Sequence, residues 1–209
     1  MEYIDSIIPF IQKYNINIKG ILHIGANDCI EYDEYSKFTN NIIYVEANPE
    51  IVDNIHLTKK YINIYQALIT DRDNEEYEFK ISNNNSQSSS ILDFNLHKNN
   101  HPNVNFINKI KLKSITIDTF LEKKLIPYNN INVLVLDIQG VELKALKGAS
   151  QLLNNIDIIY TEVNIDDTYK DCDKLDSMDI YLKQYNFKRI YTYIFYNHTY
   201  GDAVYIKTT

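Results

Sequence analysis

Three residues that follow apolar runs carry most of the chemical information in this sequence: Gly25, Glu46 and Asp137. Gly25 closes the run 20–24, and Glu46 closes the run 42–45. An acid about twenty residues after a glycine turn is typical of a carboxylate that accepts hydrogen bonds from the hydroxyl pair of a ribose. The spacing therefore predicts a nucleoside-binding site.

The turn that follows the first run, Gly25-Ala26-Asn27-Asp28, contains a single glycine. The glycine-rich fingerprint that holds the pyrophosphate of a dinucleotide is missing, which disfavours a nicotinamide-dependent oxidoreductase. S-adenosylmethionine has a ribose and an adenine but no phosphate, so one close backbone approach at Gly25 and one acid at Glu46 suffice for it. The alternative is that Gly25 only ends a strand and that Glu46 is a solvated acid.

The elements that must position these residues alternate between apolar runs and helical stripes. The expected strands cover residues 20–25, 42–46, 62–68, 131–137 and 157–163, and the strongest of the helices between them begins at Glu142 and continues to Leu153. This alternation predicts an α/β fold with a mostly parallel, doubly wound sheet. In such sheets ligands bind at the carboxyl ends of the strands, where Gly25, Glu46 and Asp137 would meet.

Two further patterns fall outside the βα alternation. Residues 77–81 alternate as in a half-exposed strand and precede a polar run, 82–90, which predicts an antiparallel excursion with a long loop. Runs 187–195 and 203–206, separated by the turn 197–202, predict an antiparallel C-terminal hairpin.

The N-terminal segment is expected to be an amphipathic helix, because Ile4, Ile7, Ile8 and Ile11 repeat at helical spacing. No linker composition follows it. We therefore expect one domain over residues 19–209, with residues 1–18 forming a helix packed on it.

Composition excludes several classes of function. The net charge of -7 and the scattered lysines disfavour nucleic acid as a partner, and no apolar run is long enough to span a membrane. The acidic N-terminus differs from a secretory signal, and Cys29 and Cys172 are too few for a disulfide framework. The sequence predicts a cytoplasmic protein, and it contains no signal for the oligomeric state.

Several segments, taken in order, resemble the FkbM family of methyltransferases. They are residues 21–27, 44–49, 85–92, 136–149, 160–164 and 201–203, among which Asp137-Ile138-Gln139-Gly140-Val141-Glu142 is the most specific. The resemblance spans roughly residue 20 to the end of the chain and implies a class I, Rossmann-like methyltransferase fold. Asp28-Cys29 departs from the family, in which many members have a residue followed by glycine at this point.

The resemblance implies S-adenosylmethionine as cofactor and assigns residues to it. Asp137 would face the sulfonium and the acceptor, and Ala67 would lie near adenine. The full set expected at the cofactor is Gly25, Ala26, Asn27, Glu46, Ala67 and Asp137.

Methyl transfer to a hydroxyl needs an aligned acceptor and a group that takes up its proton. Asp137 is the first candidate for either role, although it can also hold the amino end of the cofactor or cap the next helix. Glu162, at the end of the following strand, and His198, in the terminal turn, are further candidates, with a structural role through local backbone hydrogen bonds as the alternative for Glu162. A metal site at His97 and His101 is not predicted, since Pro102 and its asparagine neighbours favour a loop.

The polar run supplies neutral donors suited to a polyhydroxy substrate, so Gln87, Ser88, Ser89 and also Gln139 are expected at the acceptor, a small molecule or glycan. The resulting hypothesis is an S-adenosylmethionine-dependent O-methyltransferase that acts on a sugar hydroxyl in glycan or nucleotide-sugar biosynthesis. The alternatives are a metal-dependent small-molecule O-methyltransferase and a noncatalytic module that binds S-adenosylmethionine.

Overall fold

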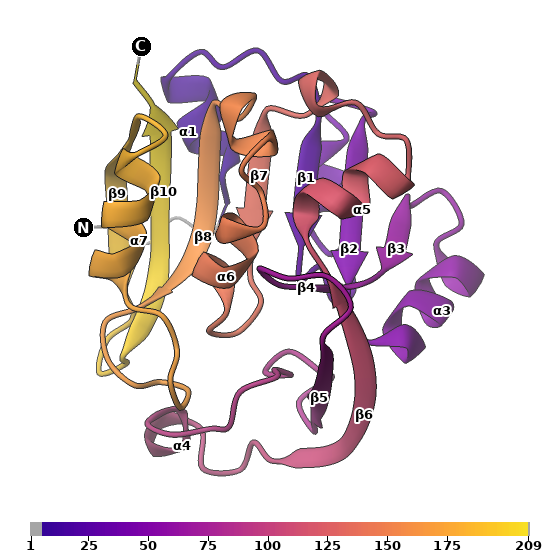
Figure 1. The fold of residues 1–209 in the computed structure, drawn as a ribbon, viewed down its shortest axis with the longest axis vertical. Helices are drawn as coiled ribbons and strands as arrows, with labels where there is room; N and C mark the ends of the chain where they lie inside the picture. The colour runs from indigo at the N-terminus through magenta and orange to yellow at the C-terminus, as the bar shows by residue number, and fades with distance from the viewer. Residues whose placement is uncertain (1–5, 209) are drawn as a thin grey trace.

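The computed structural model describes residues 6–208, which form two sheets flanked by helices (Figure 1). The larger sheet has seven strands in the order β3-β2-β1-β7-β8-β10-β9. Its strands are β1 (Ile21–Ile24), β2 (Ile42–Glu46), β3 (Ile64–Gln66), β7 (Val133–Leu136), β8 (Ile158–Asn164), β9 (Phe187–Ile194) and β10 (Tyr200–Lys207). The first five are parallel, and β10 runs antiparallel to both β8 and β9.

Helices cover both faces of this sheet. They are α1 (Ile8–Lys13), α2 (Tyr32–Tyr35), α3 (Pro49–Thr58), α5 (Ile117–Lys123), α6 (Glu142–Lys147) and α7 (Leu175–Lys183), with 3-10 turns at Tyr128–Asn130 and Leu152–Asn154. In Figure 1, α5, α6 and α7 lie in front of the sheet, and their apolar side chains share a core with one set of strand residues. The opposite set packs against α1, α2 and α3. The alternation of side chains along each strand therefore gives the protein two cores.

A small second sheet lies below the carboxyl ends of the parallel strands in Figure 1. It consists of β4 (Leu68–Ile69), β5 (Glu76–Ser82) and β6 (Phe106–Ile115), with α4 (His97–Asn100) in the connection between the last two. The pairing of β5 with β6 is antiparallel, which confirms the predicted excursion. The loop that precedes α4 therefore faces the end of the large sheet where a ligand is expected.

The class I methyltransferase topology is confirmed, but several element boundaries differ from the prediction. The third strand breaks at Ala67, where the chain leaves β3 and enters β4 in the second sheet. The helix expected to reach Leu153 ends at Lys147, and Leu152–Asn154 form a separate 3-10 turn. Gly148 follows the helix where a Cβ would lie 2.5 Å from the carbonyl oxygen of Thr70. The last strand begins at Tyr200, inside the segment predicted as a turn.

The N-terminal helix is shorter than predicted. Ile7, Ile8 and Ile11 are buried in the core that α1 shares with α2, α3 and one face of the large sheet, as their spacing predicts. Ile4 lies outside the described residues. Pro9 stands in the first turn of α1, where a proline costs no hydrogen bond.

Candidate active site

A cavity of about 370 Å³ opens at the carboxyl ends of the parallel strands. Its walls come from the turns after β1 and β7, the end of β2, the break between β3 and β4, the serine-rich loop after β5, α4 and the start of β10. The predicted site residues that line it are Gly25, Ala26, Asn27, Glu46, Ala67, Gln87, Ser88, Ser89, Asp137, Gln139 and Glu162. His198 is the one predicted site residue that does not line it.

Glu46 ends β2 and is 8% exposed. One carboxylate oxygen accepts a hydrogen bond from the backbone nitrogen of Asn27 at 3.0 Å, and the other accepts from the nitrogen of Asn48 at 2.8 Å. Burial raises the pKa of this carboxyl, and the backbone donors oppose that rise. Each oxygen keeps a second lone pair for a ligand hydroxyl, so the acid joins the two loops and still faces the cavity.

Gly25 lies where the turn after β1 crosses the end of β7. Its φ is +84°, and a Cβ would lie 1.7 Å from the carbonyl oxygen of Asp137. The glycine is therefore required for contact between two backbone segments, in addition to its place in the cavity wall. This contact ties the turn after β1 to the position of Asp137.

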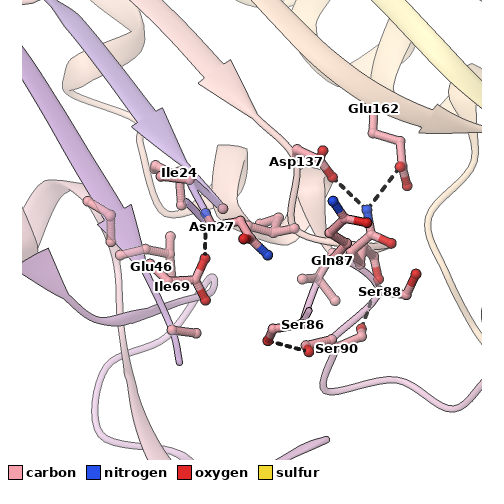
Figure 2. A pocket seen from close by; sticks show the side chains of 18 of the residues that line it. Ile24, Asn27, Glu46, Ile69, Ser86, Gln87, Ser88, Ser90, Asp137 and Glu162 are labelled. Atoms are coloured by element: carbon pink, nitrogen blue, oxygen red, sulfur yellow. Dashed lines mark hydrogen bonds between the residues drawn. The ribbon is translucent and has the colours of Figure 1, made fainter. Parts of the chain in front are cut away.

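Asp137, Gln139 and Glu162 form a hydrogen-bonded cluster at one side of the cavity. Figure 2 shows Asp137 and Glu162 in this cluster. The side-chain amide of Gln139 donates to Asp137 at 2.6 Å and to Glu162 at 3.1 Å. The hydroxyl of Tyr169 donates to the amide oxygen of Gln139 and fixes its orientation. The bridge holds two carboxyl groups side by side while Asp137 remains open to the cavity.

Glu162 is 7% exposed, and its second oxygen has no hydrogen-bond partner among residues 6–208. Burial raises the pKa of this carboxyl well above its usual range, and the charges of Asp137, Glu142 and Asp202 raise it further. An unpaired buried acceptor is costly. The cluster is therefore suited to a ligand that brings a positive charge or a hydrogen-bond donor.

Glu142 was not predicted as a site residue, although it organises the loop that carries Asp137 and Gln139. It is 2% exposed and accepts hydrogen bonds from the backbone nitrogens of Ile138 at 2.9 Å and Gly140 at 3.1 Å. Gln139 and Gly140 have φ values of +56° and +99°. The acid thus holds a strained loop. Its place in the segment that most specifically resembles the FkbM family could have identified Glu142 from the sequence.

The serine-rich loop closes the cavity opposite the large sheet. Asn27 donates from its side chain to the carbonyl oxygen of Asn85 at 2.9 Å, and Asn48 donates to the hydroxyl of Ser86 at 3.0 Å. The hydroxyl of Ser90 donates to the carbonyl oxygen of Gln139 at 2.8 Å. The loop is therefore fastened to both halves of the site, and Figure 2 shows Ser86, Ser88 and Ser90 below the carboxyl cluster.

The remaining wall is aromatic and includes residues that sequence reasoning did not place there: His97, His101 and Tyr200. His198 lies directly behind them, with its ring 5.4 Å from that of His101 and 5.2 Å from that of Tyr200. No sequence pattern indicates Tyr200, because its position depends on the register of β10 against β8.

The cavity wall is acidic. It includes Asp28, Glu31, Glu46, Asp137 and Glu162, and no lysine or arginine of the described chain is part of it. Within residues 6–208, no three His, Cys, Asp or Glu side chains are grouped so that they could hold a metal ion. The same part of the chain has no helix long and apolar enough to span a bilayer. The field at the site favours positive ligands over anions.

Comparison with known proteins gives a family for this arrangement. The model of the methyltransferase FkbM domain matches residues 23–189. No curated protein matches the sequence. Among solved structures, magnesium protoporphyrin IX methyltransferase from Synechocystis PCC 6803 with bound S-adenosylmethionine has a TM-score of 0.51 and 8% identity, over 98% of this chain and 77% of that one.

The same enzyme with bound S-adenosylhomocysteine gives a TM-score of 0.50 and 7% identity, over 98% of this chain and 81% of that one. At such low identity the likeness concerns the fold. The match to the FkbM model covers most of the sequence and includes every strand of the parallel sheet except the start of β1. The chain therefore belongs to the FkbM family of methyltransferases.

Proposed function

We propose that the protein transfers the methyl group of S-adenosylmethionine to a hydroxyl group of an uncharged sugar. The observation that carries this proposal is the cavity itself, in which the buried carboxylate of Glu46 at one side faces a bridged pair of carboxyl groups at the other. The negative charge of the protein and of the cavity wall argues against nucleic acid as the acceptor.

The residues present fit this cofactor. When bound, it supplies a methyl group activated by a positively charged sulfur. Glu46 would accept hydrogen bonds from the ribose hydroxyls, and Ala67 would contact adenine. The turn Gly25 to Asn27 would lie along the cofactor. The unpaired oxygen of Glu162 and the acidic wall would favour its positive charge.

The acceptor side is suited to hydroxyl groups. Asp137 and Glu162 are hydrogen-bond acceptors for a sugar hydroxyl, and Gln87, Ser88 and Ser89 add neutral donors in the adjoining loop. We assign Asp137 and Glu162 to the orientation of the attacking hydroxyl. Gln139 sets the distance between them and is expected near the same substrate. His198 lies behind the aromatic wall and is a candidate to take up the proton of the acceptor hydroxyl.

The negative charge of the cavity wall favours neutral saccharides over nucleotide sugars as acceptors. A nucleotide sugar brings a pyrophosphate, which the acidic wall would repel, whereas a neutral saccharide brings no charge. With tritiated-methyl S-adenosylmethionine, we expect label transfer to neutral methyl glycosides to exceed transfer to the matching nucleotide sugars by at least about tenfold in kcat/KM.

The acceptors tested are a panel of hexoses and deoxyhexoses, each supplied as a neutral methyl glycoside and as a nucleotide sugar. The two members of each pair therefore differ in whether the sugar carries an anionic nucleotide. Faster labelling of the nucleotide sugars would refute the preference for neutral acceptors. A labelled nucleic acid and no labelled sugar would refute the proposed reaction.

Substitution of Glu46 by Ala is expected to weaken the binding of S-adenosylhomocysteine by more than about 1 kcal/mol, or about fivefold or more, since a charge-assisted hydrogen bond is lost. Isothermal calorimetry measures this change. The variant also releases the backbone nitrogens of Asn27 and Asn48, so affinity alone does not isolate the ribose contact.

The 2′,3′-dideoxy analogue of S-adenosylhomocysteine provides the control. It should bind the wild type more weakly than the parent compound, and the difference should disappear in the Glu46→Ala variant. An equal preference for the parent compound in both proteins would remove Glu46 from the ribose site.

We place the reaction in the cytoplasm. Cys29 and Cys172 are both buried and unpaired, which is the usual state of thiols in a reducing compartment. Burial raises the pKa of Cys29 to about 12, so this thiol is not a nucleophile at neutral pH.

A further inference from the structure

His101 and Tyr200 form a hydrogen-bonded pair in the wall of the cavity. The Nε2 atom of His101 lies 2.9 Å from the hydroxyl oxygen of Tyr200, and both residues line the cavity. Both are partly exposed, so solvent and a ligand can reach them from the cavity. An imidazole linked to a phenol is a chemically competent path for a proton.

The register of the sheet places this pair next to the carboxyl cluster. Asp202 of β10 is paired with Glu162 of β8, so Tyr200, two residues earlier on the same face, is a diagonal neighbour of Glu162. The Tyr200 hydroxyl experiences the charges of both Glu162 and Asp137. It therefore lies on the acceptor side of the cavity.

The pair is fixed on both sides of the cavity wall. Asn100, at the end of α4, donates to the carbonyl oxygen of Asn197 in the hairpin turn at 2.7 Å, and the hydroxyls of Thr168 and Thr199 lie 2.7 Å apart. The ring of His97 packs 4.8 Å from that of His101. Contacts between α4 and the hairpin turn therefore fix the relative positions of His101 and Tyr200.

The surroundings of His101 disfavour the protonated form of its imidazole. Burial lowers the pKa of His101, and the neighbouring His198 lowers it further. His97 also packs against it, and burial lowers the pKa of His97 to about 4. Lys98 is the charged residue of α4, while Glu162, Asp137 and Asp202 face the tyrosine end of the pair. A neutral imidazole can accept a proton.

We propose that Tyr200 and His101 are catalytic residues that remove the proton of the acceptor hydroxyl, Tyr200 in contact with the hydroxyl and His101 behind it. The inference rests on the proposed O-methyl transfer. As the acceptor oxygen forms its bond to the methyl carbon, the carbon–sulfur bond breaks and its electron pair stays on sulfur. The acceptor proton passes to the phenolic oxygen of Tyr200, and the phenolic proton passes to Nε2 of His101.

The kinetic test compares His101→Gln and Tyr200→Phe with the wild type. Its acceptor is a neutral methyl glycoside that the wild-type protein methylates in the label-transfer experiment described above. Both variants should lose about a hundredfold in kcat, and the acidic limb of the pH profile should disappear in His101→Gln. S-adenosylhomocysteine should bind with unchanged affinity. His56→Gln and Tyr61→Phe, at exposed positions, are the matched controls and should behave as wild type.

Full turnover with an unchanged pH profile in His101→Gln would overturn the inference. So would loss of the acidic limb in His198→Gln together with its retention in His101→Gln. Failure of every glycoside in a protein that binds S-adenosylhomocysteine would instead count against the proposed reaction.

A second measurement needs no acceptor. Proton–nitrogen NMR spectra follow the titration of the His101 ring, identified by its absence in His101→Gln. In the proposed relay the Tyr200 hydroxyl donates to the neutral imidazole, so its removal in Tyr200→Phe should raise the pKa of His101. An unchanged titration would show that the pair does not exist in solution.

Discussion

Replacement of Asp137 by Asn is expected to lower kcat by about a hundredfold, while the affinity for S-adenosylhomocysteine changes by less than about threefold. Asn keeps the size of the side chain and an oxygen that can accept from Gln139, so the 2.6 Å hydrogen bond and the loop survive. What is lost is the negative charge that we propose orients the acceptor hydroxyl. Calorimetry and methyl-transfer kinetics on the same preparation separate the two effects.

Asp53→Asn is the matched control for this charge change, because Asp53 lies on the exposed face of α3, away from the cavity. It should have wild-type kinetics. A fully active Asp137→Asn protein would exclude the assigned role. A loss of affinity for S-adenosylhomocysteine as large as the loss in kcat would instead place Asp137 at the amino end of the cofactor.

The second large effect is expected at Glu142. Its replacement by Ala leaves the backbone nitrogens of Ile138 and Gly140 without their buried acceptor, at about 1–3 kcal/mol for each group. We expect the free energy of unfolding to fall by about 2–5 kcal/mol and methyl transfer to be lost, since the loop that presents Gln139 relaxes. Chemical denaturation measures the first change.

Glu50→Ala is the control, since Glu50 also lies in the first turn of a helix but is exposed to solvent. It should cost less than about 0.5 kcal/mol. Glu142→Gln, which retains one accepting oxygen, should fall between the wild type and Glu142→Ala. Equal stability of Glu142→Ala and Glu50→Ala would show that the carboxylate does not hold the loop.

The sequence is sufficient for the sheet and for the place of the site, because both depend on local patterns. Buried parallel strands read as continuous apolar runs, and the polar residue that ends each run must lie at the ligand-binding edge. Glu46, Asp137 and Glu162 were found in this way, and all three line one cavity. Asn48 and Pro49 likewise mark the start of α3, where Asn48 accepts from the nitrogen of Glu50.

Features that depend on contacts between distant segments were not predictable. The break at Ala67 arises because the chain pairs with β6, more than forty residues later, and Gly148 lies where a Cβ would come within 2.5 Å of the carbonyl oxygen of Thr70. Tyr200 enters the wall through the register of β10. None of these contacts leaves a periodic trace in the local sequence.

The role of Gly25 is sharper in three dimensions than in the sequence. A glycine after the first strand indicates a close approach to a ligand, but its nearest neighbour here is the backbone of Asp137. The turn after β1 and the loop after β7 are therefore in direct backbone contact. Together with the serine-rich loop, they couple the two halves of the cavity.

The central claim, methyl transfer to a sugar oxygen, is tested most directly by incubating the wild-type protein with carbon-13-methyl S-adenosylmethionine and the neutral glycosides. Heteronuclear NMR of the product identifies the atom that carries the labelled methyl group. We predict correlations from the methyl group to a sugar carbon through an ether oxygen. A labelled methyl group on nitrogen or carbon would contradict this claim.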